Sequence, residues 1–404
     1  MKKKFRSDNR LPELYILPNV HLSETINIFT AEVNEVRIVS SNATPSPLCE
    51  TDNSKAMKSG LQVLTMFLAL GCMSSHDQPV VSTFAGSGIM GMADGSLFKA
   101  SFANPMGIAA DENGNLYVAD SHNNIIRKID SSGIVSTLAG NGKTGSQDGN
   151  ANQASFFYPV ALFADHQGNI FVSDTHNNLI RKIDAAGTVS TVVGKDTSLA
   201  NERAEGSRLR LDNPAAISVD RQGNIYIADW GNNVIRRIGV DAKCIVLAGS
   251  VGQRGSKDGF REEASFYLPW GIVLDSVNNI YVSDFRNNLI RKISPQGQVT
   301  TFAGSKTRGS TDGQAEAASF FHPAGLAIDK KGNIYVADTG NNKIRKITPE
   351  GLVTTLAGDG SRGASNGPAH AASFNKPYAL AVGPDGSIFI ADYQNNLIRK
   401  VSFH

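Results

Sequence analysis

The chain has 404 residues, enough for two or three ordinary domains or for one large repeat domain. Its 39 glycines, its 19% of charged residues and its short runs of β-branched and aromatic residues indicate a globular protein built of strands and tight turns. The formal net charge is only +2, and Lys and Arg are spread along the chain without a dense basic block, which argues against nucleic acid as the main partner.

The first recognisable segment is "MKSGLQVLTMFLALGCMSS", from Met57 to Ser75. A basic residue follows a Met, and a mostly apolar run too short to span a bilayer leads to Gly71, which is the layout of a secretory signal. The ending "LALGC" resembles the lipobox of bacterial lipoproteins, which implies a lipid on Cys72, although Ala69 and Leu70 depart from the usual residues. We therefore expect a signal peptide at 57–71, a lipidated Cys72 with a linker over 72–79, and an exported lipoprotein of the bacterial cell envelope, periplasmic or at the cell surface. A short apolar core helix is the alternative.

Residues 1–56 precede this segment and show no repeat and no clear periodicity. Because signals stand at the start of a chain, we expect Met57 to be the true start, with residues 1–56 absent from the natural protein or disordered. The remaining cysteines, Cys49 and Cys244, are too few and too scattered for a disulfide framework or a metal knuckle. Cys244 opens the strand-like run "CIVLAG" and is expected to be a buried, inert thiol.

From Val80 onward the chain consists of six similar segments of about 54 residues. Each contains a "YVAD"-like run, and the spacing of the terminal aspartates is almost constant; they are Asp120, Asp174, Asp229, Asp284, Asp338 and Asp392. Each segment holds four strand candidates, which in the first segment are "MGIAAD", "NLYVAD", "IIRKID" and "IVSTLAG". Four antiparallel strands repeated six times predict an all-β fold, a six-bladed β-propeller over residues 80–404.

The ends of the repeat region predict how the ring closes. The region opens with "VVSTFAG", Val80 to Gly86, which matches a fourth strand, while the chain stops at "LIRKVSFH", which is a third strand. We expect the N-terminal strand to complete the last blade and leave no unpaired edge.

The repeated pattern, with "G-N-I-Y-V-A-D-x-x-N-N-x-I-R-K-I" at its centre and long Gly-rich connections, resembles the NHL repeat over all of residues 80–404. The resemblance implies the six-bladed NHL propeller.

Positions identical in all six segments are expected to hold the blade together. Every segment has D-x-x-N-N-x-I-R, in which Asp and Asn suit a tight turn and Arg suits a charge pair with the Asp. A metal ring of six carboxylates and a nucleic-acid stripe of "IRK" are the functional alternatives, and both are disfavoured because all six copies look alike. The second residue after each proline is always Gly or Ala, as expected where six inner strands converge.

Positions that differ between segments are candidates for recognition. In a propeller, the turn between the second and third strands and the connection to the next first strand open on one face. Large or polar side chains occupy these variable positions, and Trp and Tyr give much contact area for little lost entropy. The candidate ligand-binding residues are Met106, His122, His176, Trp230, Trp270, Phe285, Arg286, His322, Tyr378, Tyr393 and Gln394. The alternative is that these rings fill gaps between the loops.

No nucleophile elbow, phosphate loop or Ser/His/Asp arrangement is visible. Within the fold, the peptide-amidating lyases hold zinc with histidines at the channel mouth, and His122, His176 and His322 map to that face. Six-bladed lactonases and sugar-acid hydrolases place a divalent ion in the channel, but the inner strands here offer small and apolar residues. The sequence therefore favours a non-catalytic, monomeric binding propeller for a peptide, protein or glycan, with no cofactor and no metal, and a metal-dependent lyase or hydrolase is the alternative.

Overall fold

The computed structural model describes residues 78–194 and 210–403. The predicted signal peptide, Cys72, residues 1–56 and most of the connection before the third blade lie outside the described residues. Within the described part, no helix is both long and apolar enough to cross a membrane.

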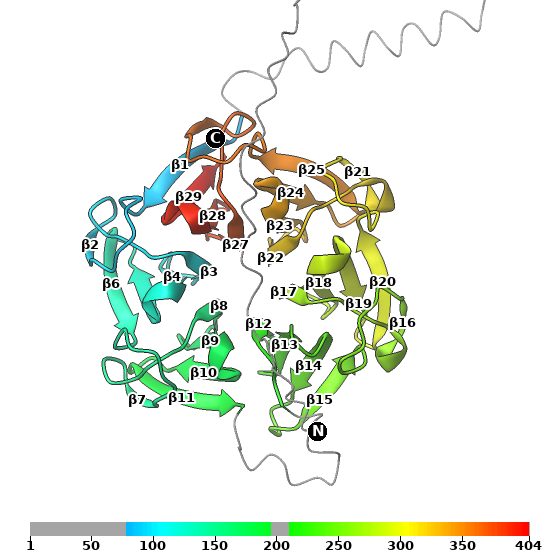
Figure 1. The fold of residues 1–404 in the computed structure, drawn as a ribbon, viewed down its shortest axis with the longest axis horizontal. Helices are drawn as coiled ribbons and strands as arrows, with labels where there is room; N and C mark the ends of the chain where they lie inside the picture. The colour runs from blue at the N-terminus through cyan, green and yellow to red at the C-terminus, as the bar shows by residue number, and fades with distance from the viewer. Residues whose placement is uncertain (1–77, 195–209, 404) are drawn as a thin grey trace, which may run out of the picture. The chain divides into compact units, whose positions relative to one another are not determined.

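The described residues form six antiparallel sheets arranged as blades around a central axis, which confirms the predicted β-propeller (Figure 1). The first strand of each blade lies next to the axis; these inner strands are β3 (Pro105–Ala110), β8 (Pro159–Ala164), β12 (Pro214–Val219), β17 (Pro269–Leu274), β22 (Pro323–Ile328) and β27 (Pro377–Val382). The second strands are β4 (Leu116–Asp120), β9 (Ile170–Asp174), β13 (Ile225–Asp229), β18 (Ile280–Asp284), β23 (Ile334–Asp338) and β28 (Ile388–Asp392).

The third strands are β5 (Ile125–Ile129), β10 (Leu179–Ile183), β14 (Val234–Ile238), β19 (Leu289–Ile293), β24 (Lys343–Ile347) and β29 (Leu397–Ser402). The fourth strands are β6 (Ile134–Ala139), β11 (Thr188–Val193), β15 (Cys244–Ala248), β20 (Gln298–Ala303), β25 (Leu352–Ala357) and β1 (Val80–Ala85). Five blades also have a two-residue outer strand that the sequence did not predict; these are β2 (Gly95–Ser96), β7 (Gly149–Asn150), β16 (Gly259–Phe260), β21 (Gly313–Gln314) and β26 (Gly367–Pro368).

The ring closes as predicted, because β1 is the fourth strand of the last blade. Val80 pairs with Ser402 and Val81 pairs with Val401, so the N-terminal strand of the repeat region lies beside the C-terminal strand of the chain. Val81 is fully buried in the core of that blade. The pairing leaves β29 with a partner on both sides.

The repeated Asp, Asn and Arg form a buried hydrogen-bonded unit in every blade. In the fourth blade, Asp284 accepts hydrogen bonds from Arg291 at 2.8 Å, from the Asn287 side chain at 2.8 Å and from the Tyr267 N–H at 2.8 Å. Both charged side chains are fully buried, deeper than the sequence led us to expect. Burial raises the pKa of Asp284 to about 6, against the opposing effect of Arg291, so the carboxyl is ionised at pH 7. The repeated Asp and Arg side chains therefore pair with one another, and Arg291 also donates to the Ser265 and Lys257 carbonyl oxygens of the preceding connection.

The second Asn of each repeat connects neighbouring blades. Asn288 has left-handed backbone with φ of 57°, a conformation that Asn tolerates, and its side-chain oxygen accepts the N–H of His322 in the next connection at 2.9 Å. The same bond recurs between every pair of consecutive blades, with donors Asn104, Tyr158, Asn213, Leu268, His322 and Lys376. Each of these donors immediately precedes a strand-opening proline.

The inner strands pack too closely for large side chains at the second position after proline. A Cβ on Gly107 would lie 2.5 Å from the Val160 carbonyl oxygen, and one on Gly325 would lie 2.6 Å from that of Tyr378. A Phe is fully buried in five of the connections between blades; these residues are Phe102, Phe156, Phe266, Phe320 and Phe374. Leu211 takes this position before the third blade and is 5% exposed. Two of the connections contain a short 3-10 turn, η4 (Arg261–Glu263) and η6 (Ala315–Ala317).

Candidate functional site

The variable residues meet at one end of the propeller. Because Pro105 pairs with Asp120 across β3 and β4, the start of each first strand lies beside the end of each second strand. The turns that follow the second strands therefore share this end with the residues around each proline. Most of these turns are short 3-10 helices, namely η1 (Ser121–Asn123), η2 (Thr175–Asn177), η5 (Phe285–Asn287), η7 (Thr339–Asn341) and η8 (Tyr393–Asn395).

Aromatic and imidazole rings at this end form one continuous set of contacts, which we call the collar. Its members are Phe157, Tyr158, His122, His176, Trp230, Trp270, Phe285, Phe321, His322, Tyr378 and Tyr393. Trp270 is the central contact on one side, with ring centroids 5.5 Å from Phe285 and 5.4 Å from Tyr378. Tyr158 is the equivalent on the other side, stacked on His176 at 4.6 Å and with its hydroxyl 3.3 Å from that of Tyr393. The collar thus joins residues of blades that are distant in sequence.

The first residue of each turn has two alternative roles. In three blades it is a buried hydroxyl that donates to the proline carbonyl of the next blade, from Ser121 at 2.6 Å, from Thr175 at 2.8 Å and from Thr339 at 2.5 Å. In the other three blades the same position holds a collar ring, namely Trp230, Phe285 or Tyr393. The hydroxyl at this position therefore contributes to blade packing, while the next residue of two of these turns, His122 or His176, still belongs to the collar.

Two collar residues are fixed by an uncommon backbone conformation. Tyr158 and His322 precede prolines and have φ of 53° and 51°, a left-handed region that side-chain-bearing residues rarely adopt. Their N–H groups donate hydrogen bonds to the side-chain oxygens of Asn124 and Asn288, and these bonds hold the conformation. Their rings are therefore positioned by the blade-to-blade connection rather than by flexible loops.

The predicted site residues differ in exposure. Met106 is only 5% exposed and Phe285 9% exposed, so both belong to the packed base of the site. His122, Arg286 and Gln394 are exposed, and the remaining predicted residues, His176, Trp230, Trp270, His322, Tyr378 and Tyr393, are half-buried. The structure brings all the predicted rings together, with Arg286 and Gln394 on the same turns. Phe157, Tyr158 and Phe321 were missed, although variation at the two positions before each proline was a signal that could have found them.

Burial changes the protonation of the collar. It lowers the pKa of His322 to about 4, with further lowering from the nearby Arg286 and Arg308 guanidinium groups. Burial also lowers the pKa of His122 and His176 and raises the pKa of Tyr378 to about 12. His122, His176, His322 and Tyr378 are therefore neutral at pH 7, and the surface of the collar is aromatic and amphipathic.

The histidines do not form a metal site. His122 and His176 both pack against Tyr158, whereas His322 stacks on Phe285 at 4.6 Å and belongs to the other side of the collar. Across residues 78–194 and 210–403, no group of three or more His, Cys, Asp or Glu side chains is placed to hold a metal ion. The metal-dependent alternative has no converging donor set in this part of the chain.

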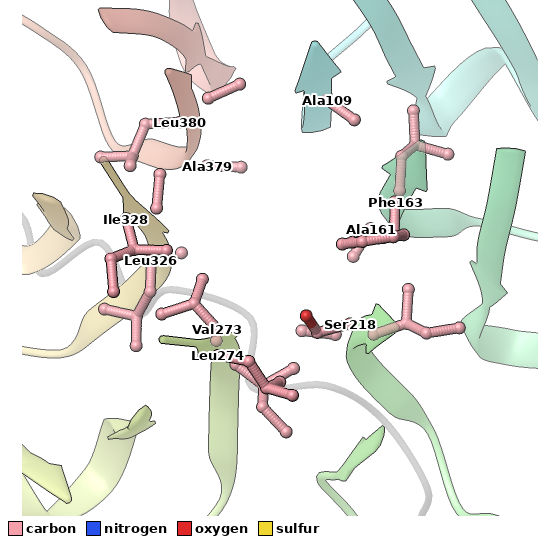
Figure 2. A pocket seen from close by; sticks show the side chains of 18 of the residues that line it. Ala109, Ala161, Phe163, Ser218, Val273, Leu274, Leu326, Ile328, Ala379 and Leu380 are labelled. Atoms are coloured by element: carbon pink, nitrogen blue, oxygen red, sulfur yellow. The ribbon is translucent and has the colours of Figure 1, made fainter. Parts of the chain in front are cut away.

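A cavity of about 500 Å³ lies along the propeller axis, below the collar (Figure 2). Its walls come from the inner strands, and the side chains that Figure 2 labels are hydrocarbon except for Ser218. The apolar inner lining was expected from the sequence, but a cavity of this size was not. Cys244 lies elsewhere, half-buried on the outer strand β15, where burial raises the pKa of its thiol.

The comparisons with known proteins agree with this architecture. Parts of the chain match the models of the Teneurin NHL domain, over residues 90–147 and 303–371, and of the NHL repeat, over residues 266–293. These matches and the relatives below support an NHL-type β-propeller.

Two relatives illustrate how far the similarity extends. Protein SUPPRESSOR OF QUENCHING 1, chloroplastic, of Arabidopsis thaliana is 29% identical over 310 residues, which cover 72% of this chain and 29% of that protein. NHL repeat-containing protein 2 of Homo sapiens is 28% identical over 321 residues, which cover 70% of this chain and 44% of that protein. The chain therefore spans less than half the length of either relative.

A solved structure shares the fold. An auxiliary nutrient binding protein from Bacteroides thetaiotaomicron superposes with a TM-score of 0.64 at 17% identity, covering 81% of this chain and 77% of that one.

Proposed function

We propose that the protein is a non-catalytic binding propeller that recognises a peptide, protein or glycan ligand on the collar. The observation that carries the proposal is the collar itself, in which rings from variable positions form one continuous surface. The Asp, Asn and Arg residues that hold every blade together are repeated six times, whereas the collar rings are not. The name of the structurally similar auxiliary nutrient binding protein supports a binding role for this fold.

The physical chemistry of the collar suits this ligand class. Half-buried Trp and Tyr rings offer large contact areas with few rotatable bonds, so little side-chain entropy is lost on binding. The backbone of Tyr158 and His322 is already fixed, which reduces the ordering cost further. Exposed Arg286 and Gln394 supply hydrogen-bond donors beside the rings. A peptide side chain or a sugar ring could stack on the rings while its polar groups meet these donors.

Peptide and glycan arrays probed with the full chain test the proposal. We expect a specific set of bound ligands whose signal falls at least tenfold for Trp270→Ala and for Tyr393→Ala, in the range of an interface hot spot. The matched control is Phe98→Ala, which removes a 63% exposed ring outside the collar and should leave the signal unchanged. Unchanged binding by both collar variants would contradict the assignment of the site.

We further propose that the natural protein is a monomer, held at a bacterial membrane by a lipid on Cys72. This proposal rests on the signal-like sequence of residues 57–75. Cys72→Ser should release the protein from the membrane fraction and abolish incorporation of labelled fatty acid. The intact mass of the natural protein tests the start site, because a mass that includes residues 1–56 would contradict a start at Met57.

A further inference from the structure

The axial cavity differs from the collar in its chemistry. The side chains labelled around it in Figure 2 include Phe163, Leu274, Ile328 and Leu380, and the hydroxyl of Ser218 is the one polar group among those labelled. Lining residues continue along the inner strands from the level of Met106 to that of Asp329, and six strand residues span roughly 20 Å. The cavity is therefore elongated, and the side chains along its walls are almost all apolar.

The collar covers one end of this cavity. Among the residues that directly follow the prolines, the small side chains Val160, Ala215 and Ala324 are at most 3% exposed, whereas the rings of Trp270 and Tyr378 are half-buried. Trp270 lines the cavity and contacts Tyr378 two blades further along the ring, so the two rings lie across the position of Ala324. Access from this end is restricted by packed rings.

The other end of the cavity lies among the turns that join the first and second strands. Charged lining residues occur only there, and they include Asp220, Arg221, Asp329 and Lys330. The carboxylates are engaged by their own turns; Asp329 accepts the Asn333 side chain at 2.8 Å and the Tyr335 hydroxyl at 3.1 Å. Charge is thus confined to the mouth and absent from the walls described above.

The apolar side chains of the cavity walls offer few hydrogen-bond partners to water. Water in a protein cavity needs two to four polar partners, whereas hydrocarbon-lined cavities take up apolar molecules. Small-molecule sites in proteins are mostly apolar and enclose roughly 300–1,000 Å³. The measured volume of about 500 Å³ falls within that range.

We propose that the axial cavity is a second binding site, which takes an uncharged, elongated apolar small molecule through the mouth opposite the collar. The site is separate from the proposed collar ligand, since its walls come from the inner strands and its mouth from turns at the other end of the blades. Burial of hydrocarbon against hydrocarbon would drive the binding.

Titration of the full chain with N-phenyl-1-naphthylamine, an uncharged probe that fluoresces in apolar surroundings, tests this proposal. We expect saturable binding at one equivalent. In a Trp230→Phe background, the emission of Trp270, which lines the inner end of the cavity, should change along the same titration curve.

Substitutions in the cavity wall locate the probe. Leu274→Gln and Ile328→Gln place an amide in the wall and should each weaken binding about tenfold. Ala110→Leu fills part of the cavity without adding a polar group and should also weaken binding. Val277→Gln is the matched control, because Val277 is apolar, 66% exposed and next to the mouth, and its replacement should have no effect.

Two results would overturn the proposal. One is the absence of saturable binding to the wild type, and the other is equal affinity in Val277→Gln and in folded forms of the three wall variants. Loss of probe binding in His176→Ala, with the wall variants unaffected, would place the probe on the collar and likewise overturn the proposal. If the Gln variants do not fold, the affinity of Ala110→Leu for the probe tests the cavity site alone. None of these outcomes changes the result expected for collar binding in the array experiment.

Discussion

The repeated turns and the collar occupy neighbouring positions along the sequence but serve opposite purposes. In the stretch from Asp284 to Arg291, Asp284, Asn287 and Arg291 are buried or half-buried and bonded to one another, and the same bonds recur in every blade. The pair Phe285 and Arg286, which lies between them, is not repeated in any other blade. The collar gathers such unmatched residues from several blades into one surface.

This difference separates stability from recognition within a single turn. A residue that is repeated in all six blades has a structural role that every blade needs, such as accepting a hydrogen bond from a buried backbone N–H group. A residue that is found in one blade only does not have a role that all six blades need. Changes to the repeated residues should therefore affect folding, and changes to the collar should affect binding.

The largest expected loss of stability comes from opening the closed ring of blades. Deleting residues 80–86 removes β1 and exposes the edge of β29, so we expect loss of most of the folding free energy of the whole propeller, about 5–15 kcal/mol for a typical domain. Circular dichroism during urea unfolding measures this. Val81→Asp, a point change at a fully buried position of β1, should act in the same direction. Fraying of one end with an otherwise normal unfolding curve would contradict cooperative closure.

Breaking one repeated charge pair should have the next largest effect. Asp284→Ala leaves the Arg291 guanidinium buried without its carboxylate, which costs about 3–5 kcal/mol. The measurement is the free energy of unfolding in urea, compared with Glu316→Ala, an exposed carboxylate whose removal should change stability by less than about 0.5 kcal/mol. A similar small loss in both variants would show that the pair does not stabilise the blade.

A larger side chain between the inner strands should lower the free energy of unfolding by a smaller amount. Gly325→Val places side-chain atoms against the Tyr378 carbonyl oxygen and the Ala379 Cα, 2.6 Å and 2.7 Å from the new Cβ, and should cost about 1–3 kcal/mol. The equivalent residue of the next blade is already Ala379, so Ala379→Gly is the matched control and should cost at most about 1 kcal/mol. Thermal unfolding distinguishes the two, and equal melting temperatures would contradict the close approach of the inner strands.

The smallest effect is a pH dependence that belongs to the collar. Because the pKa of His322 is about 4 in the folded chain and near 6.5 when unfolded, the unfolded chain takes up a proton at higher pH. The stability contributed by neutral His322 is complete above about pH 6.5 and is lost as the pH falls toward 4. After allowance for solvent screening of this half-buried ring, the loss is roughly 1–2 kcal/mol.

His322→Phe preserves a ring to stack on Phe285 and should reduce the pH dependence between 6.5 and 4, as measured by urea unfolding at several pH values. His370→Phe, at an exposed position, is the control and should leave the dependence unchanged. The opposite result, with the larger change in the control, would show that His322 is not buried in its neutral form.

The sequence predicted the repeated parts of the fold best. Six copies of one pattern fixed the four main strands, and the spare strand at Val80 predicted closure, because a missing fourth strand must be supplied from elsewhere in the chain. The two-residue outer strands, such as Gly95–Ser96, were missed because they are held by backbone hydrogen bonds and carry no hydrophobic pattern. The first turn residue also proved ambiguous, since only the structure separates Ser121, which bonds the next blade, from Trp230, which joins the collar.

The sequence predicted where the collar lies, but it did not predict all of the collar residues or the cavity. Variation between repeats identified most of the collar, yet Tyr158 was missed because its role depends on a left-handed backbone and on contacts with blades one and six. The axial cavity could not be predicted, because its volume depends on how far six converging strands are held from the axis. Apolar residues alone do not distinguish a filled core from a cavity.

The most direct test of the division between scaffold and collar is a calorimetric titration of one array-identified ligand against three proteins: the wild type, Trp270→Ala and Phe98→Ala. We predict that Trp270→Ala weakens binding at least tenfold while the protein remains folded, and that Phe98→Ala binds as the wild type does. Equal affinities for all three proteins would contradict the collar as the recognition surface.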